Sequence, residues 1–355
     1  MKFILILFLS LYFNLSYSDS LKVLFLGDTY FGDNYQMNNG NTAINEYGYD
    51  YFFENVKDIL YSSDFTIANL ETPLYRGKIK PPSGGEKYTH FADKDSTPFY
   101  LNKYNIHTVS LSNNHTFDLG KEGLSSIFSG LSYYNIHYFG AGFSEEAASL
   151  PFIYAKSGVI PYIVIFTGYW YCSRFDSVKH YYAKGDKEGV FLLDPVKISE
   201  KIKEYRGIFP NAYFVVYPHW GSNYKIQNQY QTDIAHKLID AGVDLIIGHG
   251  AHTVQEVEHY KGKWILYNIG NFIFNSPGRY GSTGAKPYGL MAELNISRDS
   301  RSLKLYPVFT NNLETDYQAR RLEEGEFDDC FNFVFKSNKD KIHRSGKEYF
   351  IIKLD

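Results

Sequence analysis

Residues 243–255 constrain the fold of this chain more than any other stretch, because a strand, a glycine and two histidines follow one another there. The mostly apolar run 243–247 predicts a strand buried on both faces. Gly248 ends it, and His249 and His252 follow within one short turn. Open α/β sheets carry their functional side chains just beyond the carboxyl ends of their strands. Two imidazoles in this place could bind a transition metal or merely satisfy hydrogen bonds at a strand end, and the stretch alone leaves both open.

Polar side chains that could bind a metal follow four further predicted strands. Asp28 follows strand 21–26, Glu71 follows strand 65–68, Asn114 follows strand 108–111, and His219 follows strand 213–217. Each alone is also explained as an N-cap or turn residue. Five strand ends that all carry possible metal ligands, on the same edge of the sheet, are improbable by chance. Their mixed nitrogen and oxygen donors suit two divalent ions about 3.5–4 Å apart, with Glu71 or Asp28 bridging.

The densest polar cluster, residues 112–120, carries a candidate acid beside a candidate ligand. Asn114 is followed directly by His115, and Asp118 comes three residues later. If Asn114 binds the metal, His115 is placed to act as general acid, with Asp118 orienting its ring. An Asn-rich turn with a hydrogen-bonded histidine is the alternative, and the cluster taken alone leaves the choice open.

The rest of the chain alternates helical and strand patterns, which predicts an α/β fold. The predicted helices are 52–61, 97–104, 123–134, 145–148, 194–205 and 233–241, and the further strands are 137–139, 160–166 and 264–267. Segment 168–187 is aromatic and basic, and it either overhangs the site as a substrate loop or forms a plain surface excursion. From Gly289 onward the pattern favours a β-hairpin. We expect one domain over residues 19–310, with residues 311–355 as an extension packed on it.

The first 18 residues predict an export signal. Lys2 gives a short positive start, residues 3–13 form an apolar core, and Ser16 and Ser18 are small residues at the cleavage positions. That core is too short to cross a bilayer as a stable helix. We therefore expect a protein exported to the periplasm, the cell surface or the medium, with an uncleaved N-terminal anchor as the lesser alternative.

Charge and cysteine usage narrow the partners and the metal ligands. The formal net charge is only −3 and no basic block occurs, so a nucleic-acid partner is not expected. The two cysteines, Cys172 and Cys330, either form one bridge or remain free thiols. Neither has metal-ligand spacing, so any metal must take nitrogen and oxygen ligands.

Six motifs, in the same order, resemble the CapA family of poly-γ-glutamate capsule-synthesis proteins. They are Gly-Asp (27–28), Asn-Leu-Glu (69–71), Ser-Leu-Ser-Asn-Asn-His-x-x-Asp-x-Gly (110–120), His-Trp-Gly (219–221), Gly-His-x-x-His (248–252) and Tyr-x-x-Gly-Asn-Phe (267–272). The resemblance covers roughly residues 21–310. It implies a metallophosphatase-like β-sandwich of mixed sheets flanked by helices.

The resemblance also implies a metal-site assignment. The implied ligands are Asp28, Glu71, Asn114, His219, His249 and His252. Metallophosphoesterases usually open with Asp-x-His, whereas Tyr30 takes the histidine's place here. The family's usual Glu after His-Trp-Gly is Asn223, and its usual Gly-His-His-Pro-His is Gly-His-Gly-Ala-His. The expected cofactor is one or two divalent ions of Mn, Zn or Fe.

Function does not follow from fold, and three hypotheses remain. The favoured one is an exported protein that helps to make, release or handle an anionic capsule polymer such as poly-γ-glutamate, with a membrane-bound polymer synthetase as a possible partner. The second is an exported metal-dependent phosphoesterase or amide hydrolase that acts on a small molecule or a polymer. The third is a metal-free binding module.

Overall fold

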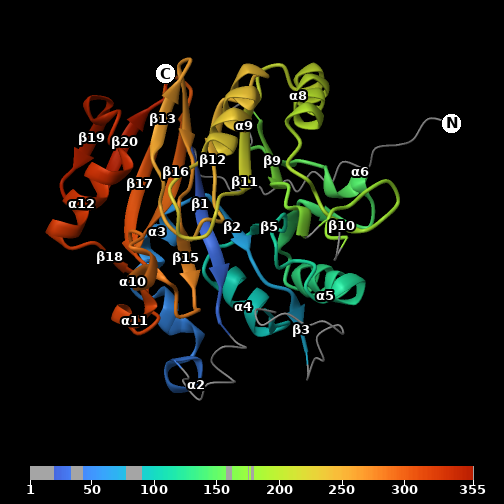
Figure 1. Cartoon of the computed structure of the whole chain (residues 1–355), viewed down its shortest axis with the longest axis horizontal. Coiled ribbons are helices and arrows are strands. Elements are labelled where there is room, and N and C mark those ends of the chain that lie inside the picture. The colour runs from blue at the N-terminus through green and yellow to red at the C-terminus, as the bar shows by residue number, and fades with distance from the viewer. Residues whose placement is uncertain are drawn as a thin grey trace.

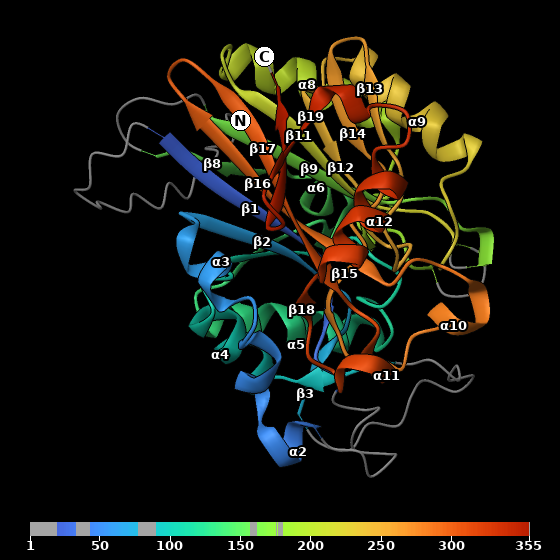
Figure 2. The same ribbon diagram turned by 90° about the vertical axis from the view of Figure 1, so that its left-hand side faces the viewer.

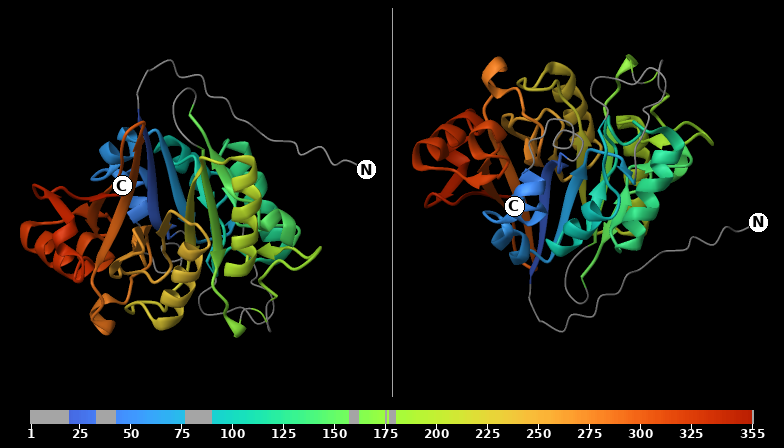
Figure 3. Two further views of the ribbon diagram at one scale, coloured as in Figure 1. Left: turned by 90° about the horizontal axis from the view of Figure 1, so that it is seen from above. Right: turned by 90° about the horizontal axis from the view of Figure 1, so that it is seen from below.

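The structure is a computed structural model that describes residues 20–32, 43–76, 90–156, 162–174, 176 and 180–354. Two large β-sheets form its centre, and helices cover the outer face of each (Figures 1 and 2). Seen from above, the sheets lie face to face, and the C-terminal elements pack at one side (Figure 3). This arrangement confirms the expected α/β sandwich of mixed sheets flanked by helices. The predicted export signal, residues 1–18, lies outside the described residues.

The larger sheet is organised around its first strand, β1. Across the sheet the order is β19 (Ile342–Ser345), β20 (Tyr349–Lys353), β17 (Arg301–Phe309), β16 (Tyr288–Ser297), β1 (Ser20–Tyr30), β2 (Phe65–Leu70), β5 (Thr108–Ser110) and β6 (His137–Phe139), with β15 (Asn271–Phe274) beside β1 and β18 (Arg320–Arg321) beside β17. β1 pairs parallel with β2 and β15, and antiparallel with β16. Its register with β2 shifts between Phe25 and Asp28, so β1 is irregular just before Asp28. Irregularities of this kind re-aim side chains at functional sites.

The smaller sheet supplies the second set of strand ends. Its order is β13 (Val257–Tyr260), β14 (Lys263–Leu266), β12 (Leu245–Ile247), β11 (Tyr213–His219), β9 (Ile163–Tyr169) and β8 (Phe152–Tyr154). The four central strands are parallel, and the two edge strands are antiparallel to their neighbours. The sheet is therefore mixed, like the larger one.

Apolar side chains from both sheets fill the space between them. Val23 and Phe25 of β1 and Ile67 of β2 share one fully buried cluster with Ile165 of β9 and Val215 of β11. Such interiors are close-packed and resist displacement. The core therefore fixes the strand ends of one sheet relative to those of the other.

Helices bury their apolar faces on the outer sides of the two sheets. The larger sheet is covered by α3 (Lys57–Ser62), α4 (Ser96–Lys103) and α5 (Gly120–Tyr133), and the smaller one by α8 (Pro195–Ile208) and α9 (Gln229–Asp240). α12 (Glu324–Val334) places Phe327 and Cys330 in the cluster that also holds the inter-sheet side chains. The shorter elements are α2 (Ala43–Tyr47), η1 (Tyr49–Phe53), β3 (Leu74–Tyr75), β4 (Ala92–Asp93), β7 (Ala141–Gly142), α6 (Glu145–Ala148), β10 (Gly189–Val190), α10 (Tyr280–Thr283), α11 (Asn312–Thr315) and η2 (Lys339–Lys341).

Two of the predicted helices differ from the structure by more than three residues at one end. The helix expected over 52–61 is wrong as one element: η1 ends at Phe53, and α3 begins at Lys57. Between them the backbone N–H groups of Glu54 and Val56 donate to carbonyls three residues back, those of Tyr51 and Phe53, so the chain makes tight turns there instead of α-helix. The helix expected from residue 233 begins at Gln229, because Asn228 and Gln231 form a capping box in front of it.

The state of the two cysteines, which the sequence leaves open, is answered by the structure. Cys172 and Cys330 are both free, the first half-buried and the second buried. Among the described residues, no helix has the length and apolar character needed to cross a membrane.

Candidate metal centre

The five predicted strand ends meet where the two sheets present their carboxyl edges. In the larger sheet, Asp28 is in register with Asn69 of β2 and with Asn271 of β15. In the smaller sheet, His219 at the end of β11 forms a β-bridge with His249 just after β12. The larger sheet thus contributes the carboxylates, and the smaller one contributes the imidazoles.

Glycines allow the two sheets to come this close. A Cβ atom on Gly27 would lie 1.9 Å from the carbonyl oxygen of Gly270, which accepts a 3.2 Å hydrogen bond from the Asp28 backbone N–H. Gly250 has φ of +107°, and a Cβ atom there would lie 2.9 Å from the His219 ring. Only glycine fits such positions without displacing the ligand-bearing residues.

Asp28, His219 and His249 form the first candidate ligand group, and all three are buried. Asp28 Oδ1 lies 3.2 Å from His249 Nδ1 and 3.7 Å from His219 Nδ1. The two Nδ1 atoms are themselves 3.1 Å apart. Two ring nitrogens that converge on one carboxylate oxygen present their donor atoms to a common point, as metal ligands do.

Asp28 also belongs to the second candidate group, with Glu71 and His252. His252 Nδ1 lies 3.2 Å from Asp28 Oδ2, and its Nε2 lies 3.7 Å from Glu71 Oε1. His252 adopts a left-handed φ of +57°. Non-glycine residues held this way cost roughly 1–3 kcal/mol and cluster at functional sites. Of the two carboxylates expected to bridge, Asp28 is the one that both groups share.

Asp28 is held in its ionised form by the groups around it. Burial by itself would raise the pKa of Asp28, but hydrogen bonds from His249 and His252 hold that pKa well below its usual range. Asn69 Nδ2 donates to Oδ1 at 2.9 Å, and the Gly250 backbone N–H donates to Oδ2 at 3.1 Å. A carboxylate that accepts several hydrogen bonds stays charged and fixed in orientation.

Glu71 is fully buried, and neither of its oxygens has a hydrogen bond of ordinary geometry within the described residues. Burial raises the pKa of Glu71 well above its usual value, although His252 and Asn114 act in the opposite direction. An uncompensated buried carboxylate costs several kcal/mol, roughly, unless a cation or donor meets it. A metal ion between Glu71 and Asp28 would remove that cost, so the donor set fits the expected group.

The pKa of His252 is raised too, and in a histidine this favours the charged form. Burial would lower its pKa, but the charge of Glu71 and the hydrogen bond to Asp28 raise the pKa of His252 to about 9. The neighbouring His219 is different, because burial lowers its pKa well below the usual value and keeps it neutral.

Asn114 and His115, adjacent in sequence, both reach the centre. Asn114 Oδ1 lies 2.7 Å from His219 Nε2. His115 Nδ1 lies 2.7 Å from Asp118 Oδ2, and its Nε2 lies 3.9 Å from Glu71 Oε1. The carboxylate on Nδ1 favours the tautomer protonated there and leaves Nε2 facing the centre. The eight residues singled out by sequence therefore lie together at one place.

Three asparagines that were not singled out hold these ligands in place. Asn69 links Asp28 to Asn113, whose Nδ2 donates to Asn69 Oδ1 at 3.0 Å. Asn113 Oδ1 accepts from the His115 backbone N–H at 3.0 Å, which turns the chain so that Asn114 and His115 face the same centre. Asn271 Oδ1 lies 2.9 Å from His252 Nδ1. All three stand inside the six sequence motifs, which was the signal available to find them.

Two aromatic contacts at the centre were also unforeseen. His90 stacks on His115 with ring centroids 3.8 Å apart, and Tyr30 stacks on the other side of His90 at 4.6 Å. Burial lowers the pKa of His90 well below the usual value, so it stays neutral. Tyr181, from the aromatic segment 168–187, donates its hydroxyl to Asp118 Oδ1. Tyr30, where metallophosphoesterases carry a histidine, thus buttresses the His115 ring through His90.

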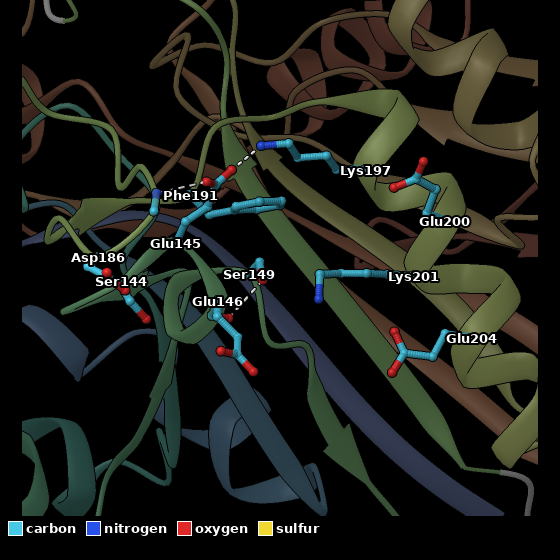
Figure 4. A pocket seen from close by; sticks show the side chains of 11 residues that line it. Ser144, Glu145, Glu146, Ser149, Asp186, Phe191, Lys197, Glu200, Lys201 and Glu204 are labelled. Atoms are coloured by element: carbon cyan, nitrogen blue, oxygen red, sulfur yellow. Dashed lines mark hydrogen bonds and ion pairs between the residues drawn. The ribbon is translucent and has the colours of Figure 1, made fainter. Parts of the chain in front are cut away.

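A hollow of about 540 Å³ lies away from this centre, between α6 and α8 (Figure 4). Its lining is mostly charged, and Glu145 of α6 pairs with Lys197 of α8 across it. None of the eight candidate site residues lines it. The hollow is therefore separate from the strand-end centre.

Comparison with known proteins gives one family match. A family model described as "Bacterial capsule synthesis protein PGA_cap" matches residues 22–276. The PGA biosynthesis protein CapA of Bacillus subtilis is 29% identical over 267 residues, which cover 73% of this chain and 65% of that protein. The capsule biosynthesis protein CapA of Bacillus anthracis is 26% identical over 261 residues, covering 73% and 61% respectively.

A third relative and a solved structure are also similar to this chain. A "Probable polyglutamine synthesis accessory protein" of Mycobacterium tuberculosis is 28% identical over 238 residues, covering 61% of this chain and 57% of that protein. The alignments thus span less than two thirds of the length of these relatives. A phosphatase from Mycoplasma pneumoniae has 15% identity and a TM-score of 0.38, with 79% of this chain and 89% of that chain covered.

Proposed function

This chain belongs to the family of bacterial capsule synthesis proteins, and from that membership we propose that it acts in the synthesis, release or handling of an anionic capsule polymer such as poly-γ-glutamate. Two relatives carry capsule or PGA biosynthesis in their names. The matched range 22–276 contains every candidate ligand from Asp28 to His252. The candidate metal centre therefore lies wholly within the part of the chain on which the proposed role rests.

The proposed function works through a metal site, and the shared Asp28 is the observation that carries this step. Buried Asp, Glu and His groups here could hold a metal ion. The proposed ligands are those predicted from the sequence: Asp28, Glu71, Asn114, His219, His249 and His252. Their nitrogen and oxygen donors, with no sulfur, suit Mn, Zn or Fe in one or two positions.

When bound, such an ion polarises a carbonyl or phosphoryl oxygen and lowers the pKa of water. The chain's own contribution is the proton supply. His115 presents Nε2 towards the centre, so it is placed to give a proton to a leaving group there. Asp118 holds the proton on Nδ1, and Tyr181 and the His90 backbone N–H in turn hold Asp118. Asn114 keeps His219 oriented through its 2.7 Å contact.

Export and a membrane partner are part of the proposal. Residues 1–18 have the composition of a cleaved signal, which would place the mature chain in the periplasm, on the cell surface or in the medium. An anionic polymer made at the membrane would meet the protein there, and a membrane-bound polymer synthetase is the proposed partner.

A metal-dependent phosphoesterase or amide hydrolase is the second candidate. The pairing of His115 with Asp118 beside two overlapping ligand groups favours it, because a positioned acid next to metal ligands suits hydrolysis of either bond. This chemistry is compatible with a polymer substrate, so the two candidates differ in substrate more than in mechanism.

The test compares two substrates on the purified mature chain. The protein, loaded with Mn or Zn, is incubated with poly-γ-glutamate, and chain length and new amino termini are measured against a chelated control. A generic phosphoester is run in parallel. Metal-dependent shortening or transfer of the polymer supports the first proposal. Turnover of the phosphoester with an unchanged polymer supports the second, and no polymer binding or turnover under any metal condition contradicts the first.

A further inference from the structure

Arg279, at the edge of the centre, is a basic side chain without an acidic partner in the described part of the chain. It is exposed, and its contacts there include no carboxylate. Its guanidinium carbon instead lies 5.1 Å from the centroid of the Tyr224 ring. A guanidinium over an aromatic face is held by cation–π attraction while its donors stay available.

Tyr224 connects Arg279 to the metal centre. Its ring centroid lies 5.7 Å from that of His252, and its backbone N–H donates to Ala251 in the ligand loop at 2.7 Å. The Tyr224 side chain is only 5% exposed, and its backbone has a left-handed φ of +58°. Arg279 is therefore separated from a candidate ligand by one fixed, buried ring.

The backbone of Arg279 is tied to the same ligands by a second route. Arg279 is the N-cap residue of α10, and Tyr280 follows it. The Tyr280 hydroxyl donates to the His252 carbonyl at 2.9 Å and accepts from Asn271 Nδ2 at 3.0 Å. The Tyr224 and Tyr280 rings also meet edge to face at 5.1 Å. The contacts through Tyr224 and Tyr280 both restrain Arg279, so binding of a ligand costs little further conformational entropy.

We propose that Arg279 receives the acidic group of the ligand, a carboxylate or a phosphate, on the His252 side of the metal centre. That this ligand is a γ-linked glutamate polymer rests on the proposed function. A planar guanidinium binds either group through two parallel hydrogen bonds. In the metal-loaded protein the carboxylates Asp28 and Glu71 would be neutralised by the ion, and a fixed cation on the His252 side would add to the attraction for an anion.

The test measures binding of two acidic probes to the metal-loaded full chain. The probes are a γ-linked glutamate oligomer and inorganic phosphate. The variants are Arg279→Gln, which removes the charge, and Arg279→Lys, which keeps it without the planar fork. Arg344→Gln is the control for loss of an exposed arginine elsewhere: Arg344 lies 5.2 Å from the Phe327 ring, on β19 and away from the His249–His252 loop, although among the described residues it pairs, unlike Arg279, with a carboxylate, that of Asp328.

Arg279→Gln is expected to weaken binding of the acidic probe by about tenfold or more, since a charged hydrogen bond is lost. Arg279→Lys should fall between it and wild type, and Arg344→Gln should match wild type. Metal content and melting temperature should not change in any variant. If Arg279→Gln binds the probes as tightly as wild type, the inference is overturned and the proposed function is unaffected. Loss of metal in Arg279→Gln would have the same two consequences.

The two probes separate this inference from the proposed function. If phosphate binding depends on Arg279 but the glutamate oligomer does not bind at all, the inference stands and the poly-γ-glutamate function falls. If wild type binds neither probe, both are overturned.

Discussion

Replacing Glu71 with glutamine should have opposite effects on stability with and without metal. The carboxyl of Glu71 is fully buried without a hydrogen bond of ordinary geometry, and burial raises its pKa well above the usual value. A group whose pKa is raised on folding stabilises the fold below its unfolded pKa, and this contribution is lost as the pH rises through the folded pKa. A tenfold difference in acid dissociation constant between the folded and unfolded states corresponds to about 1.4 kcal/mol.

In a chelating buffer at pH 8, Glu71→Gln should therefore be as stable as wild type or more stable, by up to about 1–3 kcal/mol. With metal the order should reverse, because a ligand is missing. A metal present at a hundred times its dissociation constant adds about 2.7 kcal/mol to the free energy of unfolding of wild type. The variant should gain clearly less. Chemical denaturation at pH 8, with chelator and with Mn or Zn, measures both differences.

Glu293→Gln is the matched control. Glu293 is also buried, but Asn295 Nδ2 donates to it at 2.8 Å and Ser63 Oγ at 3.3 Å. Its replacement should destabilise the fold equally with and without metal. The reasoning is refuted if Glu71→Gln behaves in the same way, with an equal loss in both buffers and a full metal-induced gain.

Three further predictions concern the acid, the pH dependence and export. His115→Gln should keep its metal and its melting temperature but lower any turnover by about 10²–10⁴-fold. Asn114→Ala should lose metal as well. If both variants lose metal equally, His115 is a metal ligand. Because His252, with a pKa of about 9, must lose a proton to bind metal, apparent affinity should fall about tenfold per pH unit below 9. Calorimetry in buffers of different ionisation enthalpy would show the released proton, and a flat affinity from pH 7 to 9 would contradict it. Intact-mass analysis should place the mature N-terminus near Asp19, and a soluble cytoplasmic form that retains Met1 would argue against export.

The candidate ligands can be named from the sequence because strand ends leave a strong local signal. Asp28, Glu71, His219 and His249 each follow an apolar run, and parallel strands bring their carboxyl ends to one edge. The sandwich of two mixed sheets came from the family resemblance and not from the pattern, which predicted only α/β alternation. Strand periodicity carries no information on which sheet a strand joins.

The residues that were missed act through contacts distant in sequence. His90 reaches His115 by ring stacking, and Tyr181 reaches Asp118 across 63 residues. Neither contact has a period or a motif.

The metal content of the purified mature protein and of its Asp28→Asn variant tests whether this centre binds metal. Asp28 is the one residue shared by the two candidate ligand groups, so its loss should disturb both. Elemental analysis after loading with Mn, Zn or Fe should find about one or two ions per wild-type chain and clearly fewer in Asp28→Asn. A wild-type chain that binds none of these metals, or a variant that binds as much as wild type, would contradict the account.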